Sequence, residues 1–211
     1  MPPATEPFWE AAYRADARPF GPLSVEILEL LDRLPRGARV LDLGAGDGRN
    51  AIPLARAGHR VTAVDRSRWA LAALRRAAIR AGCATRTDQP LGMEIVEADL
   101  ATFCPLDDYD LVIAHGVLHL LSPTECTGLL ERVRRHTRPG GWHVIAVFTD
   151  TIPPPPDLAA FCRGLFEEGE LVLRYGGWEI ESFESYELED RHPGGITHTH
   201  ALNKLVARRP G

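Results

Sequence analysis

Short apolar runs of the β type alternate along the chain with segments in which apolar residues recur at helical spacing. Five runs rich in Val, Ile and Leu predict strands at residues 39–43, 60–64, 93–97, 109–114 and 142–148. Intervening segments predict helices at 49–57, 67–80 and 123–136, and a further helix at 23–34 precedes the first strand. Ser67 is the expected N-cap of the helix at 67–80. Such alternation is typical of a parallel sheet with helices on both faces.

The C-terminal region has a different pattern. Residues 178–188 and 196–208 form two long β-type runs, joined by a short turn that contains Pro193, Gly194 and Gly195. Strands joined this closely must be antiparallel. The predicted fold class is therefore α/β, a Rossmann-like doubly wound sheet of five parallel strands plus a C-terminal antiparallel hairpin. We expect one domain over 1–211, made of an N-terminal helical segment (1–37), a core (38–148) and a C-terminal region (149–211).

Composition excludes several classes of protein. The chain has 211 residues, with 24 basic and 29 acidic side chains and a net charge of −5, and its basic residues form no run longer than pairs, which counts against a nucleic-acid partner. No apolar run approaches the roughly 18 residues of a membrane helix, and the first residues lack a secretory signal pattern. The four widely spaced cysteines predict reduced thiols rather than a disulfide framework or a zinc site. We expect a cytoplasmic protein, a monomer or homodimer, with no metal and no membrane partner.

The most informative segment is residues 40–50, which read as a strand, a tight glycine turn and the start of a helix. Its glycines are spaced G-x-G-x-G, and Asp42 precedes them by two residues. A dinucleotide-binding turn would need G-x-G-x-x-G, whose third glycine falls on Arg49. S-adenosylmethionine (SAM) has no phosphate; its aminoacid end needs acceptors for an ammonium group and donors for a carboxylate beside bare backbone. The spacing therefore favours SAM over a nicotinamide.

Acidic residues follow the next two strands. Asp65 ends the second strand, where an acid accepts hydrogen bonds from ribose hydroxyls. Asp99 follows the third strand, within reach of an adenine amino group. Each feature alone has a structural explanation, as a turn glycine, a helix cap or a turn acid, but together they predict a nucleoside-type cofactor at the carboxyl edge of the sheet. A nicotinamide oxidoreductase and a SAM-binding module without transfer activity remain alternatives.

Five segments, VLDLGAGDGRNA, VTAVDRS, VEADL, YDLVIAHGVLHLL and RPGGWHVIAVF, resemble in order the motifs of class I SAM-dependent methyltransferases. The resemblance covers residues 38–148 and implies that SAM is bound there and leaves as S-adenosylhomocysteine. It implies contacts to the aminoacid end from the glycine loop, to the ribose from Asp65 and to the adenine from Asp99 and Leu100. The predicted cofactor residues are Asp42, Gly44, Ala45, Gly46, Arg49, Asn50, Asp65, Arg66, Ser67, Asp99, Leu100, Ala114, His115 and Val117.

A narrower resemblance is to the tellurite-resistance (TehB-type) methyltransferases. It is carried by FEEGEL at 166–171 and YGGWE at 175–179. That family has a His-Arg pair where this chain has acids in Tyr186–Asp190, with Arg191 and His192 directly after. The resemblance implies a small-molecule acceptor, with tellurite or a related chalcogen oxyanion as the first candidate. A small thiol, amine or hydroxyl metabolite is the alternative.

Histidines supply the candidate catalytic groups. His192, His198 and His200 lie close together in the tail, and His198 and His200 share one face of their strand. They are candidates for proton transfer or oxyanion binding, and the alternative is a partly solvated pair on an edge strand. Arg14, Arg49 and Arg191, with these histidines, are expected to form a local positive pocket for a small anion.

The remaining candidates belong to the substrate region. The N-terminal FWE…YR segment resembles the lid of related small methyltransferases, and the predicted substrate or lid residues are Trp9, Tyr13, Phe20 and His119. The alternative for the aromatic residues is packing of the N-terminal segment onto the sheet, and for His119 it is packing within its helix. His59, His136 and His143 are predicted at surface or turn positions.

Overall fold

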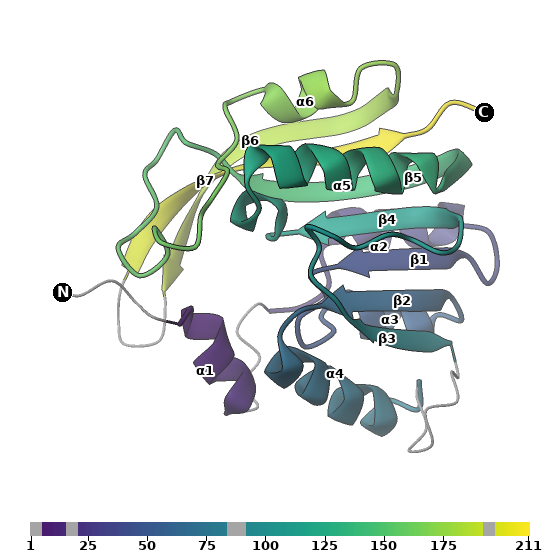
Figure 1. Cartoon of the computed structure of the whole chain (residues 1–211). Coiled ribbons are helices and arrows are strands. Elements are labelled where there is room, and N and C mark those ends of the chain that lie inside the picture. The colour runs from purple at the N-terminus through teal and green to yellow at the C-terminus, as the bar shows by residue number, and fades with distance from the viewer. Residues whose placement is uncertain (1–5, 16–20, 84–91, 192–196) are drawn as a thin grey trace.

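Seven strands form one mixed sheet in the computed structural model, which describes residues 6–15, 21–83, 92–191 and 197–211 (Figure 1). The strand order is β3-β2-β1-β4-β5-β7-β6; the first five strands are parallel, and β7 is antiparallel to both of its neighbours, β5 and β6. The strands are β1 (Arg39–Leu43), β2 (Arg60–Asp65), β3 (Met93–Glu97), β4 (Tyr109–His115), β5 (Thr137–Phe148), β6 (Glu179–Arg191) and β7 (Thr197–Arg208). The predicted fold class is confirmed.

Two hydrophobic cores flank the sheet, because successive side chains of a strand point to opposite faces. Val40 belongs to the core on one face and Leu41 to the core on the other. The first face is covered by α2 (Val25–Leu30), which continues into the 3₁₀ helix η1 (Leu31–Arg33), by α3 (Ala51–Arg56) and by α4 (Arg68–Arg80). The second face is covered by α5 (Pro123–Arg135) and α6 (Glu170–Arg174).

Side-chain caps fix where the two longest helices begin. Ser67 Oγ accepts a hydrogen bond from the Ala70 N–H at 3.1 Å, as predicted, so α4 starts directly after the end of β2. Ser122 and Glu125 form a reciprocal capping box at the start of α5. Both helix starts lie at the carboxyl edge of the sheet, and α1 (Phe8–Arg14) packs against α4 at this edge (Figure 1).

Two element boundaries differ from prediction. The strand expected at 142–148 begins at Thr137, because the Pro-Gly-Gly segment forms an irregularity inside β5, where the register with β4 shifts, and does not end the strand. Gly141 permits this: a Cβ there would come within 2.9 Å of the Arg138 carbonyl oxygen. The helix expected at 23–34 is divided into α2 and η1, and it covers a face of the sheet.

Buried polar residues show that two histidine predictions are wrong. His143 is 0% exposed and lies inside the second face, not at the surface. Its Nε2 is 2.7 Å from Thr137 Oγ1 and its Nδ1 is 2.6 Å from the Tyr175 hydroxyl, so both ring nitrogens have partners. Burial, aided by the charges of Arg134 and Arg209, lowers the pKa of His143 to about 3. His59 is also buried.

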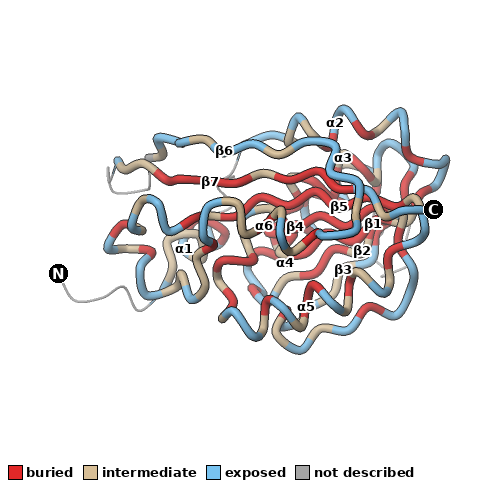
Figure 2. Tube along the Cα trace, turned by 90° about the horizontal axis from the view of Figure 1, so that it is seen from above, coloured by how far each residue is buried: buried red, intermediate tan, exposed pale blue. Residues whose placement is uncertain are grey.

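The hairpin strand β6 forms one edge of the sheet, and in Figure 2 much of it is coloured as exposed, whereas its neighbour β7 and the next strand, β5, are largely buried. All four cysteines are free thiols. None of the helices in the described ranges combines the length and apolar character needed to cross a membrane.

Candidate active site

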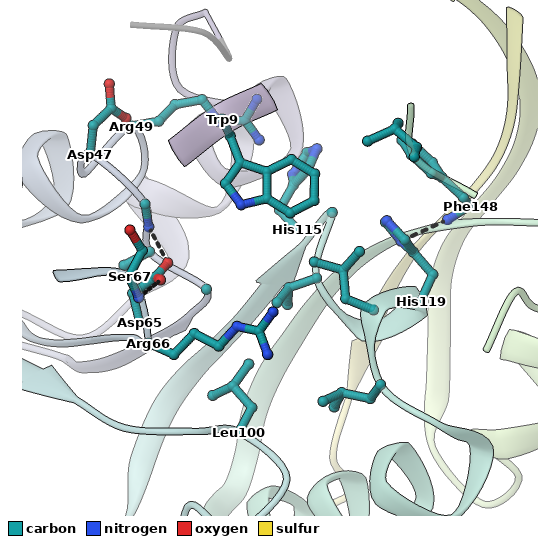
Figure 3. Close-up of a pocket in the computed structure, with 18 of the residues that line it drawn as sticks. Trp9, Asp47, Arg49, Asp65, Arg66, Ser67, Leu100, His115, His119 and Phe148 are labelled. Carbon is teal, nitrogen blue, oxygen red and sulfur yellow. Dashed lines mark hydrogen bonds between the residues drawn. The ribbon is translucent and has the colours of Figure 1, made fainter. Parts of the chain in front are cut away.

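A pocket of about 230 Å³ opens at the carboxyl edge of the sheet, where loops after β1 to β5 meet α1 and the hairpin (Figure 3). We divide it into two halves. The glycine-loop half is formed by the segments 44–50, 65–67 and 98–100. The hairpin half is formed by His119, Leu120, Leu121, Phe148, Leu158, Cys162, Leu188, Asp190, His200 and Leu202. Residues 115–117, after β4, lie between them in the chain, and Phe8, Trp9, Glu10 and Tyr13 of α1 complete the lining.

The glycine loop presents bare backbone to the pocket. Gly44 has φ of +70°, and a Cβ at this position would lie 2.7 Å from a methyl carbon of Val117. Gly46 has φ of +56°, and its missing Cβ leaves room for the Tyr13 hydroxyl, which would be 2.6 Å away. The N–H groups of Gly44 and Ala45 donate to the Val64 carbonyl, which holds the loop against β2. A larger residue at either glycine would close the space that the loop leaves.

Two buried oxygens beside this loop have no hydrogen-bond partner among the described residues, namely Asp42 Oδ2 and Asn50 Oδ1. Asp42 is 1% exposed, and burial raises its pKa to about 7 against the lowering effect of the Arg49 charge. Unpartnered buried acceptors are costly and therefore uncommon in folded proteins. An ammonium group has the donors that these oxygens lack, so the residues present fit the aminoacid end of SAM.

Asp65 stands at the end of β2 with its carboxylate held by the backbone. Its Oδ2 accepts from the Gly46 N–H at 2.9 Å and its Oδ1 from the Ser67 N–H at 2.8 Å. Burial raises the pKa of Asp65, while these hydrogen bonds lower it. Each carboxylate oxygen has a second lone pair, so the group can still accept from ribose hydroxyls. Arg66, Asp99 and Leu100 line the pocket beside it.

The residues after β4 are divided between pocket and core. His115 and Val117 line the pocket, whereas Ala114 is fully buried in the second core and is absent from the lining. Burial, together with the Arg49 charge, lowers the pKa of His115 to about 3, so this ring is neutral at pH 7.

Helix α1 covers the pocket. The Ser67 hydroxyl donates to Glu10 Oε2 at 2.8 Å, which ties α1 to the cap of α4. Tyr13 is 5% exposed and lies over the glycine loop, while the Trp9 ring is 6.0 Å from Phe161 in an edge-to-face arrangement. Both Trp9 and Tyr13 therefore pack α1 against the rest of the chain and also line the pocket, and Figure 3 shows Trp9 at the pocket.

The hairpin half contains a column of stacked rings. Phe148 lies between His119, at 4.2 Å between ring centroids, and His200, at 4.0 Å, with interplanar angles of 16° and 14°. His198 contacts His200 through their Nε2 atoms, so the predicted pair does meet on one face of β7. The Phe148 N–H donates to His119 Nδ1 at 3.3 Å, which places the proton of the neutral His119 ring on Nε2.

The structure brings most of the predicted site residues to this one pocket. Asp42 and His198 are not among the lining residues: Asp42 is buried in β1, two residues before the glycine loop, and His198 contacts His200, which does line the pocket. Phe20 and His192 lie outside the described residues. Arg14 is not among the lining residues and instead pairs with Glu6 at the surface, so it does not contribute to the expected positive pocket. In the described part of the chain, no three His, Cys, Asp or Glu side chains are grouped as a metal would require.

Several lining residues were not predicted. Phe148 ends β5 at the same edge as the other strand ends. Ligands bind at the carboxyl ends of the strands in open α/β sheets, so its position at a strand end was enough to predict it. Leu202 shares the face of His200 by strand alternation. Leu158 and Cys162 come from an irregular segment, for which the sequence gives no periodic signal.

Comparison with known proteins agrees with this geometry. Residues 40–141 match the model of a methyltransferase domain family. The match covers just under half of the chain, and with the sheet order and the order of the motifs it agrees with the fold of class I SAM-dependent methyltransferases, whose cofactor is SAM.

Among relatives, the chain resembles the probable SAM-dependent methyltransferase TehB of Haemophilus influenzae, with 28% identity over 67% of this chain and 46% of that protein. The solved structure of TehB from H. influenzae superposes with a TM-score of 0.76 at 20% identity, over 95% of this chain and 67% of that one. A protein named Hemagglutinin 1 from Eikenella corrodens is 32% identical over 69% of this chain and 45% of its own length. The chain thus spans just under half of these curated relatives.

A further solved structure contains ligands. It is the Burkholderia thailandensis 1,6-didemethyltoxoflavin-N1-methyltransferase with bound 1,6-didemethyltoxoflavin and S-adenosylhomocysteine. It has a TM-score of 0.63 and 25% identity, over 96% of this chain and 80% of that one.

Proposed function

We propose that this chain transfers the methyl group of SAM to a small-molecule acceptor bound in the hairpin half of the pocket. The observation that carries the proposal is the pair of unpartnered oxygens, Asp42 Oδ2 and Asn50 Oδ1, beside a glycine loop with no side chains in the way. This half of the pocket suits an ammonium group and bare backbone contact, and residues of α1 line the pocket as well.

The roles of the residues follow from their positions. The Asp65 carboxylate binds the ribose, Arg66 and Leu100 flank the adenine, and His115 and Val117 lie along the methionine portion. When bound, SAM supplies an electrophilic methyl group on a sulfonium, which any aligned nucleophile attacks. The work left to the protein is alignment and exclusion of water, and α1 with Trp9 and Tyr13 provides a cover for this purpose.

Proton removal is assigned to the tail histidines. His200 lines the pocket and contacts His198, so a proton taken from an acceptor hydroxyl, amine or thiol is held by a hydrogen-bonded imidazole pair. Replacing both His198 and His200 by Ala should abolish turnover of a protic acceptor and leave SAM affinity unchanged. Full activity of the double variant would return the pair to a purely structural role.

Calorimetry tests the proposal directly. The protein should bind SAM and S-adenosylhomocysteine, and NAD should give no heat of binding. If the protein bound NAD but neither SAM nor S-adenosylhomocysteine, the proposed methyl transfer would be refuted and an oxidoreductase would be favoured. Binding of SAM with no methyl transfer to any acceptor would instead indicate a module without transfer activity.

The acceptor is tested separately. Tellurite is a candidate because the chain resembles TehB, and a thiol, amine or hydroxyl metabolite is the alternative. Protein, SAM and tellurite should be assayed for a volatile methylated product, next to a panel of organic acceptors with release of S-adenosylhomocysteine as the common readout.

A further inference from the structure

The hairpin half of the pocket has walls of a defined chemical character, which bears on its acceptor. Both faces of the Phe148 ring are covered, one by His119 and the other by His200, and all three rings line the pocket. A column stacked in this way presents ring edges to the space beside it. Aromatic edges carry the positive part of the ring quadrupole and attract the negative face of another ring.

Apart from Cys162 and Asp190, the other residues of this half are apolar. Leu158, Leu188 and Leu202 line it, and Leu188 lies next to His200 in the register of β6 and β7. Trp9 of α1 covers the pocket and contributes a further ring. These surfaces favour a flat acceptor with little charge, because burial of apolar area is the main source of affinity here.

The charges of the lining are distributed unevenly. Among the described lining residues, the arginines are Arg49 and Arg66, both in the glycine-loop half, and Arg49 lies near Asp42 and Asp47. The hairpin half contributes the acid Asp190. His119 is fully buried, and burial lowers its pKa to about 3, so it offers one N–H donor and no positive charge at pH 7.

We infer that the acceptor is a flat, uncharged aromatic molecule that carries one protic nucleophile, such as a ring nitrogen or a hydroxyl group, and that its ring lies against the edges of the column formed by His119, Phe148 and His200. This inference rests on the proposed methyl transfer. The Nε2–H of the neutral His119 ring can donate a hydrogen bond to a lone pair on such an acceptor. An oxyanion would lose its hydration shell to leucines, ring edges and an acid, a cost that needs cations or several donors to offset.

Binding to the complex with S-adenosylhomocysteine tests the inference without relying on turnover. The affinity for S-adenosylhomocysteine is measured first by calorimetry, so a failure of the proposed function is seen as a failure of this step. Saturation-transfer NMR and calorimetry then compare 4-hydroxyquinoline and 2-naphthol with decahydro-2-naphthol, which has a similar size and a hydroxyl but no aromatic ring. Sodium tellurite and sodium selenite are titrated in parallel.

The expected result is that the aromatic probes bind at least about fivefold more tightly than the saturated one and displace no cofactor product. Phe148→Leu should remove most of this preference while the affinity for S-adenosylhomocysteine is kept. Phe183→Leu, the same change on β6 against the second core, is the matched control and should keep the preference. If Phe148→Leu does not fold, the aromatic and saturated pair in the natural protein decides the question.

Two results would overturn the inference. One is failure of the aromatic probes to bind a protein that does bind S-adenosylhomocysteine. The other is equal or tighter binding of tellurite, selenite or the saturated alcohol at the same site, detected by competition with the aromatic probes.

Discussion

Two buried polar sites, one beside β1 and one on the side of the hairpin, differ in whether their hydrogen bonds are complete. On the β1 side, Asp42 Oδ2 and Asn50 Oδ1 are buried without partners beside the glycine loop. On the hairpin side, His143 is as deeply buried, but both of its ring nitrogens are bonded, to Thr137 and Tyr175. The energetic cost of the first arrangement is recovered only when a ligand binds, whereas the second is complete within the folded chain.

This difference separates binding from stability. A change on the β1 side should alter cofactor affinity, and a change in the His143 network should alter the free energy of unfolding with little effect on the cofactor. The following variants test that separation.

The largest effect is expected from Gly44→Ala. The new Cβ would meet Val117 at 2.7 Å in a backbone conformation of positive φ, with a combined cost of about 2–5 kcal/mol for strain and overpacking. This cost should lower the free energy of unfolding, and displacement of Val117, which lines the pocket, should also lower the affinity for S-adenosylhomocysteine measured by calorimetry. Gly58→Ala is the matched control, since Gly58 also has positive φ but has no atom within 4 Å of its Cβ position. An equal loss in both variants would mean that strain alone, and not the closeness of Val117, explains the effect.

Asp65→Ala should come next. Hydrogen bonds to a charged group contribute about 1.5–3 kcal/mol, so SAM affinity should fall roughly 10- to 150-fold. Asp65→Asn keeps the shape and one acceptor oxygen and should lose less than the Ala variant. Unchanged SAM affinity in Asp65→Ala would remove the ribose assignment.

The hydrogen bonds of His143 should make the free energy of unfolding depend on pH, with little effect on cofactor affinity. The folded pKa is about 3 and the unfolded value is about 6.5, so below pH 6.5 only the unfolded state takes up this proton and stability falls as the pH falls. The contribution approaches about 1.4 kcal/mol per pH unit well below 6.5. His143→Gln keeps a donor and an acceptor for Thr137 and Tyr175 but does not titrate.

Denaturant unfolding between pH 7 and pH 5 measures the difference. His115 and His119 shift in the same direction, while Asp42, with a folded pKa of about 7, gains stability as the pH falls. These contributions are common to the natural protein and His143→Gln, so the difference between their slopes isolates His143. Identical slopes would contradict a neutral buried ring.

The smallest effect is expected from Glu10→Ala, which removes the hydrogen bond between α1 and Ser67 but keeps the cap of α4. A bond of this kind contributes about 1 kcal/mol, so the affinity for S-adenosylhomocysteine should fall a few-fold and amide exchange in residues 8–14 should become faster. Glu6→Ala, which breaks an exposed ion pair with Arg14, is the control and should change neither quantity. No change in amide exchange for Glu10→Ala would show that packing alone holds α1.

The β1 side and the hairpin side also differ in how much of their structure the sequence predicts. The strands of the β1 side were predicted to within a residue, because β1, β2 and β3 are short runs rich in Val, Ile and Leu that are followed by glycine or end in an acid. The site residues after them follow from one rule, since parallel strands place their carboxyl ends at one edge.

The hairpin side depends on contacts between distant segments. The position of His143 inside the second face is set by Tyr175, whose approach no local pattern reveals. The ring column needs Phe148 from β5, His119 from the 3₁₀ helix η2 (Leu118–Leu120) and His200 from β7 to meet in space. The sequence indicated that His198 and His200 share a face, but not that an aromatic ring separates His200 from His119.

Strand β6 has a consequence for association between molecules. It is a 13-residue edge strand, and the open hydrogen-bonding groups of so long an edge can pair with a second chain. Its acidic residues are Glu179, Glu181, Glu184, Glu187, Glu189 and Asp190. Two copies that approached edge to edge would bring these carboxylates against each other at neutral pH, so the strand that closes the pocket on one side also discourages fibrous self-association on the other.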